Sequence, residues 1–216
     1  MSRQGRDQNQ REPLPPRELA GELAVLRPLR AVDRKKSVQW RNDPEIRDNV
    51  LGYRFPVTEE MEANWVQAVL KDQSRTRLIL AIEDRIDGML VGFVYLNNID
   101  WFARNAELGI LIGERSRHGK GLGKDALALV TDYAFETLNL NKLYLRVVAF
   151  NRRALRLYRS FGFIEEGIQR EQTFSGGRCH NVVLMGLLRR EFKRGPMHRS
   201  GAFRPRRHVC RRPRVG

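Results

Sequence analysis

The residues best suited to chemistry in this 216-residue chain form a glycine-rich segment, His118-Gly119-Lys120-Gly121-Leu122-Gly123. It lies between an apolar run predicted as a strand, 107–113, and a segment predicted as a helix from about residue 124. Glycine allows positive φ and a close ligand approach, and the free N–H groups and dipole of a helix N-terminus favour an anion. Arg117, Lys120 and Lys124 add positive charge. The segment predicts a pyrophosphate site, with a flexible strand-to-helix turn as the alternative.

The spacing excludes two common phosphate motifs. Lys124 is followed by Asp125 rather than by Ser or Thr, and no glycine lies five places before Gly123, so the segment is not a P-loop. The glycine spacing does not match the dinucleotide fingerprint either. The four histidines are dispersed, and Cys179 and Cys210 lack CxxC spacing, so we expect no metal site.

A second segment, 151–163 (NRRALRLYRSFGF), has the pattern of a capped helix that follows a strand. Asn151 is a good helix N-cap, and Ala154, Leu157 and Tyr158 fall on one helical face. Core packing explains the apolar residues. A buried tyrosine hydroxyl, however, needs a polar partner. Tyr158 is therefore either a core residue or a group that faces a ligand.

The remaining elements must position these two segments. Strands are predicted at 23–29, 78–83, 89–97, 107–113, 142–149, 163–173 and 181–188. Helices are predicted at 33–41, 58–71, 124–138 and 151–160. This order describes a single α/β (α+β) domain with a mixed, mostly antiparallel sheet. We expect the domain to span 22–192, between a flexible extension at 1–21 and a disordered basic tail at 193–216.

Composition bounds the class of protein. Hydrophobic residues make up 41% of the chain, which is enough for a core. Its longest apolar run is eight residues, and the N-terminus lacks an apolar stretch, so we expect neither a membrane span nor a signal peptide. A cytoplasmic protein is the expectation. The net charge is +15, and nine of the basic residues lie in 193–216, where there is no acid. This tail could contact RNA or a ribosome, or be a solvated extension.

Together the two segments resemble the GNAT superfamily of acetyl-CoA-dependent N-acetyltransferases. The resemblance lies in a strand, a glycine anion loop, a helix, a strand, and then N-x-x-A-x-x-L-Y followed by F-G-F. W-R-N-D-P at 40–44, A-E-L-G-I at 106–110 and V-V-L-M at 182–185 are similar to one branch of it. That branch holds ribosomal-protein N-terminal, spermidine and nucleotide-amino-sugar acetyltransferases. The resemblance implies a cofactor cleft between two splayed central strands and acetyl-CoA without a metal, and dimers are common in the family.

The resemblance also implies a role for each matching residue. Residues 117–124 would hold the CoA pyrophosphate, and the strand Ile110-Leu111-Ile112 would pair with the pantetheine amides. Asn151 and Ala154 would lie near the cofactor arm. Tyr158 would protonate the leaving thiolate, which is a tolerable leaving group because a thiol has a pKa of about 8.5. His118 stands where the family usually has Gln or Arg.

The implied reaction moves the acetyl group directly to a primary amine. At pH 7 a lysine-like amine, with a pKa of about 10.4, is neutral only about once in 2,500 molecules and needs a base. An α-amino group, with a pKa of about 7.8, is neutral roughly one time in seven, so a water chain could suffice. Glu107 is the candidate base or amine-orienting carboxylate, with a paired strand carboxylate as the alternative. His180 is the other titratable candidate.

The acceptor itself is less well defined. The implied acceptor segment is 40–65, whose candidates are Arg41, Asn42, Tyr53, Arg54 and Phe55, with ordinary packing as the alternative. The basic body favours a protein N-terminus or an amino sugar over a polyamine, and no membrane partner is expected. The competing hypotheses are an RNA-binding protein and a CoA-binding regulatory protein, each on an inactive acetyltransferase scaffold.

Overall fold

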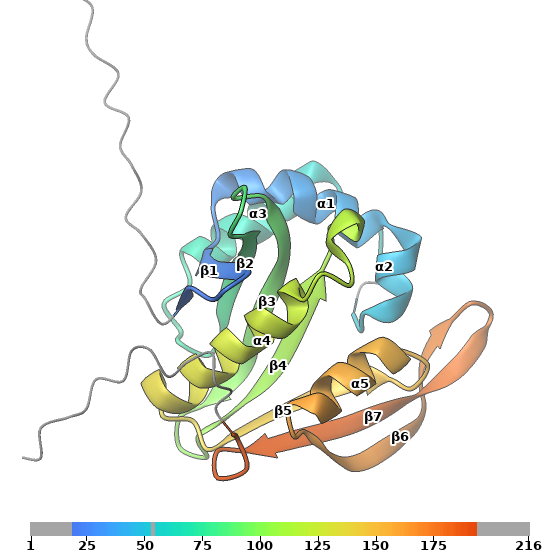
Figure 1. Cartoon of the computed structure of the whole chain (residues 1–216). Coiled ribbons are helices and arrows are strands. Elements are labelled where there is room, and N and C mark those ends of the chain that lie inside the picture. The colour runs from blue at the N-terminus through green and yellow to red at the C-terminus, as the bar shows by residue number, and fades with distance from the viewer. Residues whose placement is uncertain (1–18, 53–54, 194–216) are drawn as a thin grey trace, which may run out of the picture.

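A computed structural model describes residues 19–52 and 55–193. In this part of the chain, helices cover a seven-stranded sheet of order β1-β2-β3-β4-β5-β7-β6 (Figure 1). The strands are β1 (Ala24–Pro28), β2 (Leu78–Asp84), β3 (Leu90–Asp100), β4 (Asn105–Ile112), β5 (Lys142–Val148), β6 (Ile164–Ser175) and β7 (Arg178–Leu188). The helices are α1 (Arg34–Asn42), α2 (Pro44–Asn49), α3 (Glu59–Leu70), α4 (Leu122–Asp132) and α5 (Arg152–Ser160).

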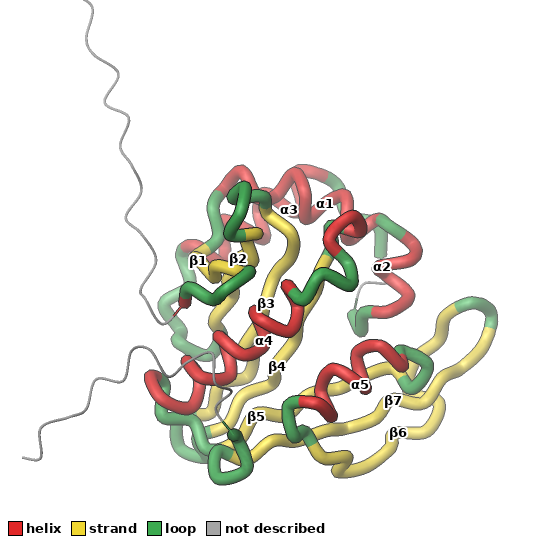
Figure 2. The backbone as a smooth tube through the Cα atoms, in the orientation of Figure 1, coloured by secondary structure: helices red, strands yellow, loops and turns green. Residues whose placement is uncertain are grey.

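The sheet is antiparallel except at its centre, which confirms the predicted mixed and mostly antiparallel architecture. Only β4 and β5 run parallel, and their pairing covers just Asn105–Glu107 against Lys142–Tyr144. Beyond these residues β4 continues to Ile112 and β5 to Val148 without pairing to each other. The two central strands therefore diverge, and Figure 2 shows the gap that opens between them.

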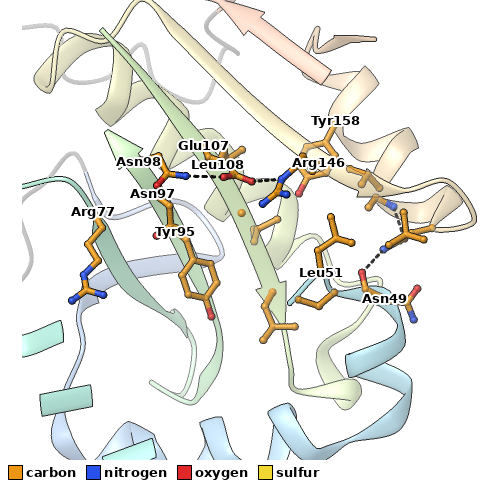
Figure 3. A pocket seen from close by; sticks show the side chains of 18 of the residues that line it. Asn49, Leu51, Arg77, Tyr95, Asn97, Asn98, Glu107, Leu108, Arg146 and Tyr158 are labelled. Carbon is orange, nitrogen blue, oxygen red and sulfur yellow. Dashed lines mark hydrogen bonds and ion pairs between the residues drawn. The ribbon is translucent and has the colours of Figure 1, made fainter. Parts of the chain in front are cut away.

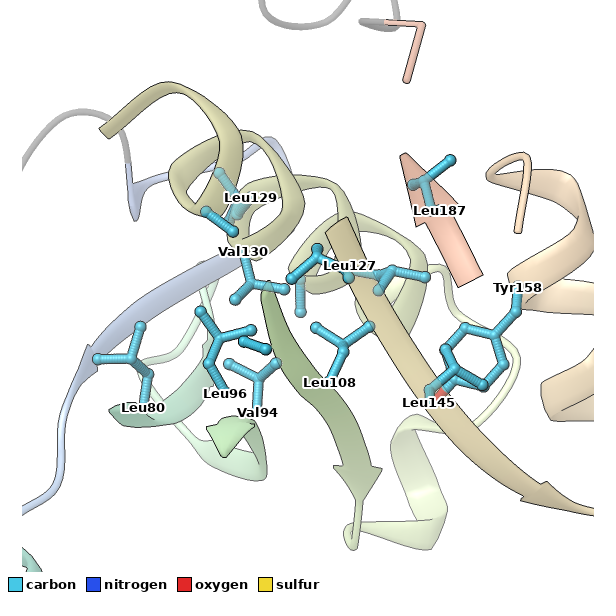
Figure 4. Close-up of a cluster of buried hydrophobic side chains, with 14 of the residues drawn as sticks. Leu80, Val94, Leu96, Leu108, Leu127, Leu129, Val130, Leu145, Tyr158 and Leu187 are labelled. Carbon is cyan, nitrogen blue, oxygen red and sulfur yellow. The ribbon is translucent and has the colours of Figure 1, made fainter. Parts of the chain in front are cut away.

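Two apolar clusters hold the helices against opposite faces of the sheet. On one face, α4 and α5 pack onto the strands, and Leu127 and Val130 of α4 lie over Leu96 and Leu108 (Figure 4). On the other face, α1, α2 and α3 pack around Phe93. Burying apolar side chains on both faces is the main stabilising contribution to such a domain.

Local signals explain most element boundaries. The predicted cap at Asn151 is confirmed, because its Oδ1 accepts a hydrogen bond from the Ala154 N–H at 3.0 Å. Helix α2 is the element that sequence reasoning missed, since Pro44 indicated only the end of the preceding helix. A proline is well suited to the first turn of a helix, and Asp43 caps α2 by accepting from the Glu45 N–H at 3.0 Å. The helix after the glycines continues from Asp132 as one π-helical turn.

The described chain is packed from its first residue. Leu19 is buried in the same cluster as α4, so packing begins three residues before the predicted domain start at 22. None of the described helices is long and apolar enough to cross a bilayer. In the same residues, no group of three or more His, Cys, Asp or Glu side chains could hold a metal ion. The predicted N-terminal extension up to residue 18 and the basic tail from residue 194 lie outside the described residues.

Asp125, the residue that distinguishes the glycine loop from a P-loop, joins α4 to β1. Its buried Oδ2 accepts hydrogen bonds from the N–H groups of Leu23 and Ala24, both at 2.8 Å. A Cβ atom on Gly21 would lie 2.2 Å from the same oxygen, so position 21 has no room for a side chain. This contact fixes the start of α4, and with it the glycine loop.

Replacing Asp125 with Ala should therefore lower the free energy of unfolding by about 2–4 kcal/mol, because two N–H groups in a packed region lose their acceptor. Urea denaturation measures this change. Asp125→Asn keeps one acceptor oxygen and should lose less. A loss below about 0.5 kcal/mol for the alanine variant, the range of ordinary surface substitutions, would contradict this role.

Candidate functional site

The glycine loop joins β4 to α4 and leaves its backbone donors free. Gly119 and Gly121 have φ of +78° and +86°, a conformation that favours glycine. Within the described residues, the backbone N–H groups of 119–123 make no hydrogen bond. Gly121 is the N-cap of α4, and Leu122 begins the helix. Five consecutive free donors at a helix N-terminus have the geometry of an anion-binding site.

The cationic side chains of the loop have different environments. Arg117 donates to Asp84 at 2.9 Å and to Asp87 at 2.5 Å, so its charge is balanced and it anchors the loop to the β2–β3 turn. A cleft lies beside the glycine loop. Lys120 is exposed and does not line this cleft. Lys124 lines that cleft, and so does Arg153, which sequence reasoning missed. In the described part of the chain neither makes an ion pair, so both can face an anion.

Two cavities meet where β4 and β5 diverge. The cleft beside the glycine loop has a volume of about 480 Å³, and the second cavity, drawn in Figure 3, has a volume of about 550 Å³. The residues that line both come from α2, β4 and α5: Asn49, Val50, Ile110, Leu111, Asn151, Ala154 and Tyr158. We call the first the loop cleft and the second the acceptor-side cavity. Their shared residues mark the point where two ligands could meet.

The register of β4 fixes which backbone groups face this junction. Ile112 lies opposite Gly92, and the Gly113 N–H donates to the Val91 carbonyl at 2.9 Å. This makes Ile112 a non-hydrogen-bonded position, so its N–H and C=O point away from β3, as do those of Ile110 two residues earlier. Leu111, between them, bonds to β3.

His118 further restricts this edge. Its Nε2 lies 2.7 Å from the Ile112 carbonyl oxygen, and since a carbonyl can only accept, Nε2 carries the hydrogen. Ile110 is consequently the residue whose N–H and C=O both remain available to an extended ligand. Of the predicted strand Ile110-Leu111-Ile112, only part of the backbone is therefore free.

Tyr158 lies at the junction with its ring in the core. The ring packs edge-on against Phe163, with centroids 5.6 Å apart, and the residue is 5% exposed. Tyr158 also lines both cavities. It is therefore both a core residue and a residue that can face a ligand, the two roles that the sequence allowed. Burial raises the pKa of its hydroxyl. The phenol therefore keeps its proton at neutral pH and is suited to donating a hydrogen bond.

Glu107 lines the acceptor-side cavity but is not a free base. Its Oε1 accepts from the Arg146 Nε at 2.8 Å and its Oε2 from the Asn98 Nδ2 at 3.1 Å (Figure 3). The alternative of a paired strand carboxylate thus describes its contacts. An amine that approached Glu107 would have to share the carboxylate with Arg146 or displace Asn98. Orienting an amine fits this environment better than removing its proton.

Comparison with known proteins adds independent information. A profile of the acetyltransferase (GNAT) domain matches residues 24–164. The chain belongs to the GNAT acetyltransferase family. This confirms the predicted family, and the seven-stranded mixed sheet agrees with it.

Several proteins are similar to this chain in sequence. A spermidine N(1)-acetyltransferase of Vibrio cholerae is 38% identical over 103 residues, which are 48% of this chain and 59% of that protein. A putative ribosomal N-acetyltransferase of Bacillus subtilis is 35% identical over 107 residues, 50% of this chain and 58% of that protein. The chain thus spans less than two thirds of the length of these curated relatives.

Solved structures match over a longer range. The crystal structure of spermidine N-acetyltransferase from Vibrio cholerae in complex with CoA and spermine has a TM-score of 0.71 at 29% identity, covering 78% of this chain and 97% of that chain. A dodecameric structure of the same enzyme has a TM-score of 0.65 at 29% identity, covering 77% of this chain and 94% of that chain.

Helix α2 contacts both the glycine loop and the start of α5, beside the loop cleft. Arg115, at the glycine loop, forms ion pairs with Asp43 at 2.5 Å and Glu45 at 2.8 Å at the start of α2. At the other end of α2, the Asn151 Nδ2 donates to the Asn49 carbonyl at 3.3 Å. The helix therefore connects the loop to α5 next to the shared lining of the two cavities, as its place in Figure 1 shows.

The predicted acceptor segment has mainly structural contacts. Trp40 packs edge-on against Phe93, with ring centroids 5.4 Å apart. Arg41 pairs with the buried Glu62 at 2.7 Å, and Asn42 bonds both backbone groups of Val57. The expectation that these residues contact an acceptor is not supported by their contacts, because core and loop groups already occupy them.

Phe55 and His180 line neither cavity. Phe55 is exposed, and Tyr53 and Arg54 lie outside the described residues. The His180 Nε2 lies 3.1 Å from the Ser175 carbonyl in the β6–β7 hairpin, and its ring packs against Phe150. The acceptor-side cavity is lined by strands β3, β4 and β5, by the residues before β2, by α5 and its cap, and by Asn49, Val50 and Leu51 of the predicted acceptor segment.

Proposed function

We propose that this chain is an N-acetyltransferase that moves the acetyl group of acetyl-CoA directly to a primary amine in a ternary complex. The observation that carries the proposal is the set of five free N–H groups at 119–123, beside the open edge of β4 and the buried Tyr158. The family membership supports it, and so does the related Vibrio cholerae enzyme solved with CoA and spermine.

The residues then have distinct tasks. The amides of 119–123, with Lys124 and Arg153, would hold the pyrophosphate, and Ile110 would pair its N–H and C=O with the amide groups of the pantetheine arm. Acetyl-CoA supplies the acetyl group as a thioester. Asn151 and Ala154 line both cavities beside that arm. These contacts would leave the acetyl carbon near Tyr158, where the two cavities meet.

Transfer forms a C–N bond between the amine and the acetyl carbon and breaks the C–S bond. Glu107, held by Asn98 and Arg146, would orient the amine, and the proton that the nitrogen releases would pass to water in the open cavity. Tyr158 would donate a hydrogen bond to the departing sulfur and lower the cost of the developing thiolate. No covalent acetyl-enzyme is needed, because amine and thioester would be bound together.

The proposal is tested by thiol release from acetyl-CoA with the full-length chain and a panel of amines. The panel should hold amino sugars, peptides with free N-termini and polyamines. We expect release that depends on both acetyl-CoA and an amine. Calorimetric titration with acetyl-CoA in the same buffer checks donor binding. Absence of heat and of amine-dependent thiol release from the folded chain would overturn the proposal, whereas heat without turnover would indicate a CoA-binding regulatory protein.

We consider two classes of acceptor amine. A protein N-terminus or an amino sugar is our first candidate, because two arginines and a single carboxylate line the acceptor-side cavity. A polyamine is the second, because spermidine acetyltransferases are among the relatives.

We also propose that the chain forms oligomers. The edge strand β6 exposes Ile164, Ile168 and Phe174, and the Vibrio cholerae relative has a dodecameric structure. An RNA contact of the tail stays a prediction.

A further inference from the structure

We propose that the acceptor carries an anionic group, a carboxylate or a phosphate, on the same molecule as its amine, and that Arg77 binds this group, while Arg146 adds a second guanidinium to the same cavity. The proposal rests on the proposed N-acetyltransferase function and names the substrate class of the same site. It separates this chain from enzymes that acetylate polycations.

The sheet register places Arg77, Glu107 and Arg146 on the same face of the sheet. Asn97 lies opposite Glu107, and Glu107 pairs with Tyr144 of β5, two residues before Arg146. Arg77 directly precedes β2, and alternation puts it on the same face as Ile79, whose partner on β3 is Tyr95. All of these side chains therefore share one face of four adjacent strands. Figure 3 shows Arg77, Tyr95, Asn97, Glu107 and Arg146 around the acceptor-side cavity.

Each arginine is anchored through one nitrogen and presents the others. The Arg146 Nε donates to Glu107, and the Arg77 Nε donates to Asp72. Asp72 is suited to this task, since hydrogen bonds from Ser74 and then from Arg77 lower its pKa to about 2. Within the described residues, the terminal nitrogens of both arginines make no other hydrogen bond. A guanidinium held in this way can bind a carboxylate or phosphate through two parallel hydrogen bonds.

The free donors of the acceptor-side cavity favour an anion over a polycation. Its charged lining consists of Arg77, Arg146 and Glu107, and the carboxylate is already paired. The other polar lining groups are neutral: Asn49, Thr76, Tyr95, Asn97, Asn98, Asn151 and Tyr158. A polyamine would meet two guanidinium groups whose carboxylate partners, Asp72 and Glu107, are already paired, whereas an anion would meet the free terminal nitrogens of both arginines and amide donors. Glu107 lies between them, where it can orient the amine of the same molecule.

Matched acceptors test the proposal. Thiol release from acetyl-CoA would be measured with glucosamine and glucosamine 6-phosphate, with Ser-Ala-Ala, Ser-Glu-Ala and Ser-Lys-Ala peptide amides, and with spermidine. We expect at least one anionic acceptor to exceed its neutral partner in kcat/KM by about tenfold or more, the scale of a hydrogen bond to a charged group, with spermidine and the lysine peptide lowest. The sugar pair reports a phosphate and the peptide pair a carboxylate.

The variant Arg77→Gln should reduce the ratio of anionic to neutral kcat/KM about tenfold, while activity on the neutral acceptor shows that the chain is folded. Arg77→Lys should keep part of the preference. Arg170→Gln, an exposed arginine on β6, is the matched control and should leave the ratio unchanged. Equal rates for each pair, a preference for spermidine, or an unchanged ratio in Arg77→Gln would overturn the proposal while the acetyltransferase function stands. No thiol release with any amine would overturn both.

Discussion

The variant Gly121→Asp should lose acetyl-CoA affinity by at least about a hundredfold. The N–H groups of 119–123 make no hydrogen bond within the described residues, and a carboxylate at position 121 would lie close to the proposed pyrophosphate site. Two like charges 4 Å apart repel by about 1 kcal/mol in water and about 4 kcal/mol at a protein surface, and each 1.4 kcal/mol is a tenfold change in affinity. A Cβ atom at this position would also lie 2.9 Å from the Leu23 Cδ1. Calorimetric titration with acetyl-CoA measures the loss.

Gly121→Asn is the matched variant, because it has the same shape without the charge. It should bind acetyl-CoA more weakly than the natural chain but better than Gly121→Asp. Gly88→Asp places the same substitution at another positive φ, +68°, in the β2–β3 turn with open space around it, and should leave binding unchanged. Natural affinity in Gly121→Asp would show that the glycine loop does not hold the cofactor.

The variant Tyr158→Phe should lower kcat by about ten- to a hundredfold, at or below the lower end of general acid catalysis, because a thiolate can leave without full protonation. The ring packs against Phe163 and would keep its place, so the dissociation constant for acetyl-CoA should stay within about twofold. Steady-state kinetics with a saturating amine, together with titration of acetyl-CoA, separates the two effects.

Tyr144→Phe controls for the loss of a phenol near the same strands. Tyr144 lies on β5 and lines neither cavity, so its kcat should not change. The raised pKa of Tyr158 makes a further distinction, because its phenol keeps the proton through neutral pH and into the alkaline range. The natural enzyme should therefore show no loss of activity from ionisation of Tyr158 between pH 7 and 9. An unchanged kcat in Tyr158→Phe would remove its proposed role.

Features set by neighbouring residues could be predicted from the sequence. The Asn151 cap, the strand before the glycines and the helix after them each depend on a few consecutive side chains, and the structure contains all three. Helix α2 was missed although Asp43 and Pro44 form a recognisable helix start. At six residues it is too short to show a periodic apolar face.

Features set by distant residues could not be predicted. Arg117 was expected to face an anion and does line the loop cleft, but its partners Asp84 and Asp87, about thirty positions away, could not be predicted. Glu107 was a candidate base, but Arg146, thirty-nine positions along the chain, holds its carboxylate. Periodicity gives the face on which a side chain lies, whereas its partner depends on how the strands are ordered. For this reason the sequence did not predict that Arg77 and Arg146 line the acceptor-side cavity together with residues 49–51 of the predicted acceptor segment.

The short pairing between β4 and β5 has a mechanical consequence. Three residue pairs join β4 to β5, so the sheet has two parts, β1–β4 and β5–β7–β6, connected by this short ladder. A ligand lying along β4 next to Tyr158 contacts both parts. Binding of this ligand then also opposes separation of the two parts, because a ligand that binds only while the two parts are together favours that arrangement by mass action. A bound ligand would thus add to the buried cluster that already joins the two parts of the sheet on the α4 and α5 face.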